Sequence, residues 1–305
     1  MKKKSRFFQM ICSLSAVCLT LLVSSPLALL AFSNINTAPP AVQPESLSKA
    51  AMYTEPSLVA DAYYMNENTD SQPILAKPAY DVFTVEERQA KGLALEVPKA
   101  SPYYGAKVVY LTFDDGPDPD NTPVVLNILK DSGIKATFFV VGNQVEKYPD
   151  ILRRIYQEGH AIGNHSYNHV YRELYQSPNS YVLQLRHTDQ VIKQTIGVRP
   201  RISRAPGGSA GSFTKEYWEM LRKLGYIEMG WNISSGDASS ANAKRIMGNI
   251  AAQMENKNLW SHAVVLMHDG RGHSETVKAL PEIIKYYKDR QFEFGVINLE
   301  TPSPW

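Results

Sequence analysis

Short apolar runs alternate with longer, more polar segments from about residue 105 to the end of the chain. The apolar runs are rich in β-branched and aromatic residues, which is typical of buried strands. They cover residues 107–113, 136–141, 160–163, 201–204, 226–231, 263–267 and 292–298. We expect helices in the segments between them, at residues 122–130, 149–158, 177–196, 214–224, 240–255 and 275–289.

Prolines and glycines mark the limits of these expected helices. Pro123 and Pro178 fit a first helical turn, and Gly133, Gly197 and Gly225 fit positions just past a helix end. Strands that alternate with helices in this way indicate parallel βα units. We therefore predict the α/β class and a distorted, closed or nearly closed (β/α) barrel with about seven parallel strands; an open, doubly wound sheet is the alternative.

The first 32 residues have the pattern of an export signal. Positions 2–6 form a basic stub, and an almost uncharged run follows at 7–32. A bilayer span needs about 20 apolar residues, so this run could remain as a membrane anchor. Pro26 and the small residues Ala31 and Ser33 favour cleavage instead. We favour the anchor, and either outcome places the rest of the chain outside the cytoplasm, held at the membrane or secreted to the cell wall.

Residues 33–104 are rich in Pro, Ala, Ser, Asn and Glu, and their prolines interrupt any long helix. We predict a mostly disordered tether there, with one short docked helix between Tyr80 and Leu95. The catalytic domain is expected at 105–305. Both cysteines precede the tether, so disulfides and thiol catalysis are excluded from the exported part. A net charge of +2 gives no sign of nucleic-acid binding.

Polar residues with catalytic potential follow five of the expected strands. They are Asp114 and Asp115 after the first strand, His165 after the third, Arg204 at the end of the fourth, Asp237 after the fifth and His268 after the sixth. In βα barrels the carboxyl ends of the strands meet at one face, where the functional residues lie. The pattern therefore predicts a single shared site.

The residue types suggest a metal site within that face. His165 and His169 are four positions apart, which on a helical turn puts both imidazoles on one side. Imidazoles and one carboxylate form a three-ligand set that leaves positions open for water and substrate, as catalytic sites do. The neighbouring carboxylate could then act as a base and His268 as an acid. Taken alone, the aspartate pair fits a capped turn equally well.

Five segments, in order, resemble the motifs of the polysaccharide deacetylases of carbohydrate esterase family four. They are TFDDGP at 112–117, GNHSYNH at 163–169, RAPGG at 204–208, the segment around Asp237, and VVLMHDG at 264–270. The resemblance extends over about 107–298. It implies a distorted (β/α) barrel that binds a divalent metal and hydrolyses N-acetyl groups of amino sugars in a glycan.

The resemblance also implies which residues hold the metal. Asp115, His165 and His169 would be its ligands. This ligand set accepts several divalent ions, and availability decides among them. Zinc is the ion that we expect, with cobalt, nickel and iron as alternatives.

The resemblance further implies the acid and the base. Asp114 would be the catalytic base, oriented by Arg204, whose charge would keep the carboxylate ionised. His268 would be the catalytic acid, and Asp237 would tune it.

Three positions would contact the substrate, and two positions depart from the family. The backbone N–H of Gly207 would stabilise the oxyanion, while Trp231 and Leu266 would surround the acetyl methyl group. Gly207 stands where many family members have an aromatic residue, and Ala238 stands where they have tryptophan. Both changes would open the groove.

Some nearby aromatic residues allow two interpretations. Tyr167, Tyr171 and Tyr175 could line a sugar groove, but we favour helix packing for Tyr171 and Tyr175. His273 follows the acid's loop and could touch substrate, although a structural role is favoured.

The predicted function is metal-dependent N-deacetylation of a cell-wall glycan by a monomer. The preferred substrate is N-acetylglucosamine of peptidoglycan. N-acetylmuramic acid, chitooligosaccharides and an exopolysaccharide remain alternatives, and acetate esters of xylan rank last. Two other classes stay open: a catalytically silent glycan-binding protein on the same fold and a metal-dependent phosphatase, for which Arg204 is the one evident basic group.

Overall fold

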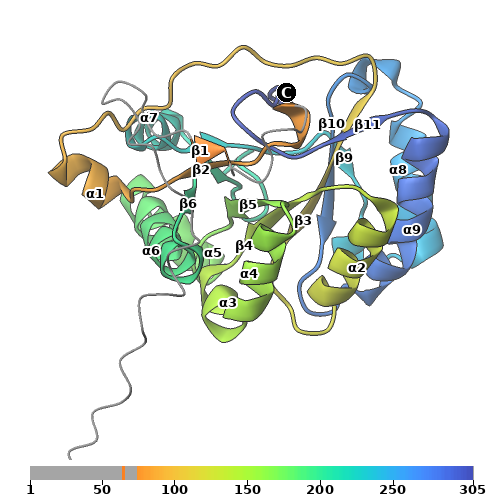
Figure 1. Ribbon diagram of the computed structural model, residues 1–305, viewed down its shortest axis with the longest axis horizontal. Helices are drawn as coiled ribbons and strands as arrows, with labels where there is room; N and C mark the ends of the chain where they lie inside the picture. The colour runs from red at the N-terminus through yellow and green to blue at the C-terminus, as the bar shows by residue number, and fades with distance from the viewer. Residues whose placement is uncertain (1–63, 66–73, 305) are drawn as a thin grey trace, which may run out of the picture. The chain divides into compact units, whose positions relative to one another are not determined.

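The computed structural model describes residues 64–65 and 74–304 (Figure 1). Its centre is a curved sheet with the strand order β8-β7-β5-β4-β3-β10-β9, and β11 also pairs with β3. The strands are β3 (Val108–Asp114), β4 (Thr137–Val140), β5 (Ala161–Asn164), β7 (Ile202–Ser203), β8 (Ile227–Glu228), β9 (Ile233–Ser234), β10 (Ala263–His268) and β11 (Glu293–Gly295). Every pairing in this sheet is parallel, as the alternating pattern predicts.

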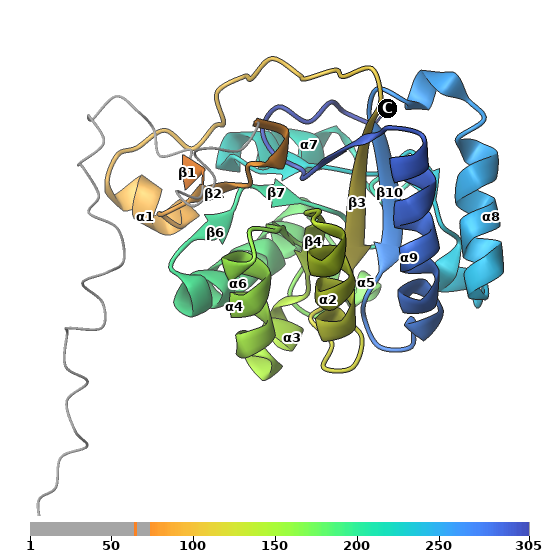
Figure 2. The ribbon, with the colours of Figure 1, turned by 45° about the vertical axis from the view of Figure 1, so that its right-hand side comes forward.

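Helices follow the strands and cover the outside of the sheet (Figure 2). They are α2 (Thr122–Ser132), α3 (Gly142–Lys147), α4 (Pro149–Gln157), α5 (Tyr171–Leu174), α6 (Pro178–Ile196), α7 (Lys215–Leu224), α8 (Ala243–Gln253) and α9 (Ser274–Asp289). The limits of α6 show why the boundaries could be predicted. Ser177 accepts a hydrogen bond from the Ser180 N–H at the start, and Gly197 ends the helix with φ 84°.

The sheet curls into a partial barrel whose ladder does not close. The expected strand at 226–231 forms only β8, and the chain then crosses to β9 at the opposite edge of the sheet. Within the described residues no ladder joins β8 to β9. The last predicted strand is also shorter than expected. As β11 it pairs with β3 from Val108 to Tyr110, while β4 pairs with β3 from Thr112 to Asp114.

The main core lies between the sheet and the helices. All seven residues of β3 are buried, and Leu111 and Phe113 pack with Leu126 and Leu129 of α2. Complete burial of such side chains contributes about 1.5–3 kcal/mol each. A strand that is buried along its whole length therefore carries Asp114 at its carboxyl end, and Asp115 follows directly.

Part of the segment expected as a tether is packed on this domain. It contains β1 (Tyr64–Met65), a short 3-10 helix (Ile74–Ala76), β2 (Ala79–Asp81) and α1 (Val85–Ala90), and β2 pairs antiparallel with β1 and with β6 (Arg199–Pro200). The buried Tyr80 hydroxyl donates to the His160 carbonyl at 3.0 Å and accepts from the Ile162 N–H at 3.1 Å. The packing therefore begins well before Gly105, because this segment supplies its own apolar residues to the core.

The short helix α1 lies where we expected one to dock. Thr84 caps it, and the Thr84 and Glu87 side chains bond each other's backbone N–H groups. Within 64–65 and 74–304 no helix is long and apolar enough to cross a bilayer. The predicted export segment at 1–32 and the first part of the tether lie outside the described residues.

Candidate active site

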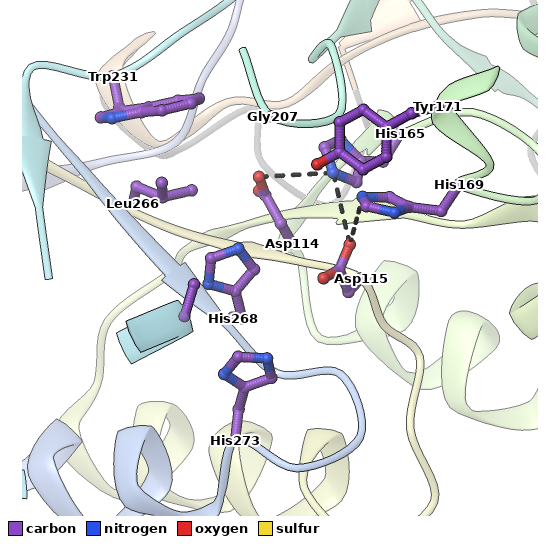
Figure 3. A pocket seen from close by; sticks show the side chains of 11 residues that line it. Asp114, Asp115, His165, His169, Tyr171, Gly207, Trp231, Leu266, His268 and His273 are labelled. Carbon is purple, nitrogen blue, oxygen red and sulfur yellow. Dashed lines mark ion pairs between the residues drawn. The ribbon is translucent and has the colours of Figure 1, made fainter. Parts of the chain in front are cut away.

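The carboxyl ends of the strands surround one cavity of about 290 Å³ (Figure 3). Its lining residues come from six regions of the chain and are Asp114, Asp115, His165, His169, Tyr171, Gly207, Trp231, Ala238, Leu266, His268 and His273. Arg204 and Asp237 are buried behind this lining. The structure therefore brings together the predicted metal, acid–base and acetyl-contacting residues, and it also places in the lining Tyr171 and His273, for which we favoured a structural role.

The two adjacent aspartates face the same cavity because the backbone turns between them. Neighbouring residues of a strand point to opposite faces. Asp115 leaves the strand with φ 76°, a left-handed conformation that costs most residues about 1–2 kcal/mol and that aspartate tolerates better. Asp114 is only 2% exposed, whereas Asp115 is partly exposed at the cavity.

Asp115, His165 and His169 converge on a common point. The Asp115 Oδ1 atom lies 3.2 Å from His169 Nε2 and 3.5 Å from His165 Nε2, and it accepts no hydrogen bond from the described residues. A buried carboxylate oxygen facing two imidazole nitrogens, with no donor between them, fits a divalent cation. The ligand atoms all lie within 4.8 Å of one another.

The tautomer of His165 suits this role. Its Nδ1 lies 2.8 Å from the carbonyl oxygen of Arg204, which can only accept, so Nδ1 carries the proton. The lone pair of Nε2 therefore faces Asp115. Burial lowers the pKa of His165, against the opposing charges of Asp114 and Asp115, and this favours the neutral ring that a metal ligand needs.

The histidine segment is a loop, and the expected helical turn is absent there. Ser166 and His169 both have positive φ, 78° and 59°, and these turns bring the two imidazoles to 5.2 Å between ring centres. Asn164 and Ser166 fasten the loop. The Asn164 side chain accepts from the Ser166 N–H at 3.1 Å, and the Ser166 hydroxyl accepts from the His169 N–H at 3.1 Å.

A buried ionic network supports this loop from behind. Asn164 donates to Asp189 Oδ1 at 2.8 Å, and Arg199 donates to Asp189 Oδ2 at 3.0 Å. Arg199 also reaches Asp81, the residue of β2 that pairs with Arg88 and Arg201. A continuous set of bonds thus connects the N-terminal segment with the loop that carries His165.

Arg204 holds Asp114 in place from inside the partial barrel. Its Nη1 donates to Asp114 Oδ1 at 2.8 Å and to the Thr112 hydroxyl at 2.7 Å. Its other nitrogens donate to the carbonyls of Met229 and Gly230, in the crossing between β8 and β9. The guanidinium therefore bridges the gap in the sheet and fixes the rotamer of Asp114.

His268 and Asp237 form a second pair across the cavity, in which Asp237 is buried and His268 is partly exposed. His268 Nδ1 lies 2.8 Å from Asp237 Oδ1, and the backbone N–H of His268 donates to Oδ2 at 2.7 Å. Burial alone would lower the pKa of His268, but the bond to Asp237 and the charge of Asp114 raise it to about 9. Burial would raise the pKa of Asp237, and the bond to His268 holds it at about 2. These interactions therefore favour the protonated form of His268.

Aromatic side chains stand on both sides of Asp114. Figure 3 shows Trp231 and Leu266 on one side and Tyr171 on the other. Tyr171 lines the cavity and is 50% exposed, so the helix packing that we favoured for it is wrong. Tyr175 does pack as expected, since its hydroxyl donates to the Pro206 carbonyl at 2.6 Å.

Comparisons with known proteins identify the family of this chain. The chain matches the model of the polysaccharide deacetylase family over residues 102–229. A peptidoglycan-N-acetylglucosamine deacetylase of Bacillus cereus is 32% identical over 260 residues, which are 81% of this chain and 90% of that protein. The chain belongs to the polysaccharide deacetylase family.

Two further relatives extend this result. A CE4 esterase of Streptococcus mutans has a solved structure that is 33% identical with a TM-score of 0.60, covering 69% of this chain and 94% of that one. A chitooligosaccharide deacetylase of Bradyrhizobium is 31% identical over 208 residues, or 62% of this chain and 88% of that protein. The predicted α/β fold and the predicted class, a deacetylating hydrolase, are thus confirmed.

Proposed function

We propose that this chain is an exported, metal-dependent N-deacetylase of peptidoglycan, and that N-acetylglucosamine is the sugar it modifies. The observation that carries the proposal is the arrangement around one cavity of a three-ligand group and two proton-transfer residues, each held by its own charged partner. The Bacillus cereus relative, named for this substrate, supports the choice of sugar.

Asp115, His165 and His169 would hold the ion, and we propose zinc. Their imidazole and carboxylate atoms are ligands that zinc prefers, although cobalt, nickel and iron accept the same set. A divalent ion bound there would supply Lewis-acid chemistry to the reacting acetyl group.

Asp114 would act as the base. Its Oδ1 is engaged by Arg204, and Oδ2 lies on the side of His165, 3.7 Å from Nε2. Oδ2 is therefore the atom to which the attacking water transfers its proton. Arg204 stays charged and cannot take this proton itself, so it keeps the carboxylate oriented throughout.

His268 would act as the acid. Its Nδ1 is occupied by Asp237, which leaves Nε2 as the proton donor toward the cavity. As the carbon–nitrogen bond breaks, the departing nitrogen takes the proton from Nε2, and the products are acetate and a free amine. Asp237 stabilises the charged imidazolium before this transfer.

Gly207, Trp231 and Leu266 would position the acetyl group. The Gly207 N–H has no acceptor within the part of the chain that the structure describes, so it is available for a developing oxyanion. Trp231 and Leu266 provide apolar surface for the methyl group. Ala238 leaves more space beside them than tryptophan would.

The decisive experiment compares the parent enzyme with Asp114→Asn on peptidoglycan. We expect acetate release by the parent in the presence of the ion, loss of at least about a hundredfold in the variant, and normal activity for Asp120→Asn. Asp120 is an exposed carboxylate close in sequence and serves as the matched control. Equal release by the parent and Asp114→Asn would contradict the proposal, and absence of release from the parent would favour a silent glycan-binding protein.

Defined muropeptides and chitooligosaccharides identify the sugar. The Bradyrhizobium relative makes chitooligosaccharides the second candidate. Mass spectrometry would locate the loss of one acetyl group on N-acetylglucosamine if the proposal holds. Loss on N-acetylmuramic acid would retain the enzyme class and change the substrate.

The basic stub and apolar run at 1–32 support action outside the cytoplasm. We place the segment 33–104, whose described part packs on the catalytic domain, after this export element, and we propose a monomer. Cell fractionation followed by N-terminal sequencing would show whether residues 1–32 are retained in the mature protein.

A further inference from the structure

Two aromatic rings lie against the adjacent glycines 207 and 208, of which Gly207 lines the cavity. Gly207 and Gly208 have positive φ, 72° and 88°. A Cβ atom on Gly207 would lie 2.8 Å from Tyr171 Cε1 and from the Tyr171 hydroxyl oxygen, and one on Gly208 would lie 2.9 Å from Trp231 Cη2. The absence of side chains at both positions therefore lets Tyr171 and Trp231 lie directly on the backbone.

Tyr171 is held by its neighbours and keeps a free hydroxyl. Its ring meets the His169 ring edge-on, at 5.4 Å between centres and 89° between planes. Among the residues that the structure describes, none forms a hydrogen bond with the Tyr171 hydroxyl, although the side chain is 50% exposed and lines the cavity. In contrast, the hydroxyl of the neighbouring Tyr175 is occupied by Pro206.

These contacts suggest a binding role. An aromatic ring fixed in place offers a large contact surface at little cost in side-chain entropy, and a free hydroxyl can add a directional hydrogen bond. Ligand sites combine such apolar walls with a few polar groups that set orientation. Tyr171 stands across Asp114 from Trp231 and Leu266, so a sugar that presents its acetyl group to Asp114 passes beside the ring (Figure 3).

We propose that Tyr171 is a substrate-contacting, specificity-determining residue whose ring packs on the amino sugar undergoing deacetylation and whose hydroxyl bonds that sugar. This inference rests on the proposed function. Because Gly207 has no side chain, the wall over this turn is supplied by α5. The structural alternative is that Tyr171 only supports the His169 ring.

The test separates sugar binding from support of the metal site. The full-length chain, the Tyr171→Ala variant and the Tyr171→Phe variant are loaded with zinc, and zinc content and affinity are measured. Steady-state kinetics are then recorded with N-acetylglucosamine oligomers and with 4-nitrophenyl acetate, which carries no sugar. Tyr104→Ala is the matched control, because Tyr104 is exposed and does not line the cavity.

We expect Tyr171→Ala to raise KM for the oligomers about tenfold, which corresponds to about 1.4 kcal/mol. The value of kcat, the zinc affinity and the hydrolysis of 4-nitrophenyl acetate should stay within about twofold. Tyr171→Phe should show a smaller rise in KM, since it keeps the ring. An unchanged KM, or equal losses on both substrates together with weaker zinc binding, would overturn the proposal. Absence of acetate release from any glycan by the parent would instead remove the proposed function, and this inference with it.

Discussion

Asp237 is the residue whose replacement tests the acid–base assignment most directly. Its two oxygens accept hydrogen bonds from His268 Nδ1, the His268 N–H, the Ser235 hydroxyl and the Thr276 hydroxyl. The change Asp237→Asn keeps the size of the side chain, removes its charge and replaces one acceptor with a donor. The imidazolium of His268 thereby loses its main stabilising partner.

The magnitude follows from the pKa of His268. With Asp237 present this pKa is about 9, and burial acts to lower it. Without the carboxylate we expect a pKa no higher than the ordinary value of about 6.5. The difference corresponds to about 3 kcal/mol of interaction with the protonated ring. At pH 8 the protonated fraction would fall about thirtyfold, whereas at pH 5.5 both rings would carry the proton.

The assay is acetate release from a glycan oligomer between pH 5 and 10, with the same ion bound to both enzymes. Since the acid must be protonated, activity falls as pH rises through its pKa. A bound cation lowers the pKa of His268 in both proteins. The measured quantity is therefore the displacement along the pH axis between the alkaline limbs of the two activity profiles. We expect the limb of Asp237→Asn at least about two pH units below that of the parent.

Thr276→Val provides the control, because it removes one hydrogen bond from Asp237 and leaves the charge in place. Its alkaline limb should move far less than that of Asp237→Asn. If the limb of Asp237→Asn coincides with that of the parent, Asp237 does not set the proton affinity of the acid. A uniform loss at every pH would point to a structural role for Asp237.

Other buried charges and the metal group lead to further expectations. Arg204→Gln leaves Asp114 buried without its partner, so chemical denaturation should show a loss of about 3–5 kcal/mol, and acetate release should nearly vanish. Asp81→Asn leaves three buried arginines without their shared carboxylate and should cost a similar amount, whereas the exposed Asp120→Asn should stay within about 0.5 kcal/mol. Chelation should abolish acetate release reversibly, and zinc at about a hundred times its Kd should stabilise the protein by about 2.7 kcal/mol in thermal unfolding. His165→Ala should remove this zinc-dependent stabilisation.

The sequence was sufficient to predict the strands that are buried along all or nearly all of their length. The runs that became β3 and β10 pair over six residues, and their apolar side chains leave no other placement. Parallel order then brings their carboxyl ends together, which is why Asp114 and His268 could be placed in one site. The run at 226–231 is different, because its pairing depends on distant strands. In the middle of that run the Arg204 side chain donates to the carbonyls of Met229 and Gly230, which therefore bond to a guanidinium group and not to a neighbouring strand.

The parts of the site that could not be predicted depend on loops and long-range packing. The spacing of His165 and His169 suggested a helical turn, whereas positive φ at Ser166 and His169 places the same imidazoles together from a loop. We interpreted Tyr171 as a packing residue because neither the hydrophobic periodicity nor the spacing of residues along the chain reveals that its ring lies over Gly207. Asp189 supports the loop from α6, a contact across 25 residues that no local pattern contains.

The placement of Asp114 and Asp115 depends both on the sequence pattern and on the backbone conformation that only the structure shows. Adjacency predicts two carboxylates at a strand end, but alternation along a strand would send them to opposite faces. The left-handed backbone of Asp115 reverses that outcome, and the surroundings then separate the two residues chemically. Asp114 stays on the strand and meets Arg204 inside the partial barrel, while Asp115 turns toward two imidazole nitrogens. A conformational cost of about 1–2 kcal/mol at one residue thus creates two different carboxylates from identical neighbours, and their partners account for the division between proton transfer and metal binding.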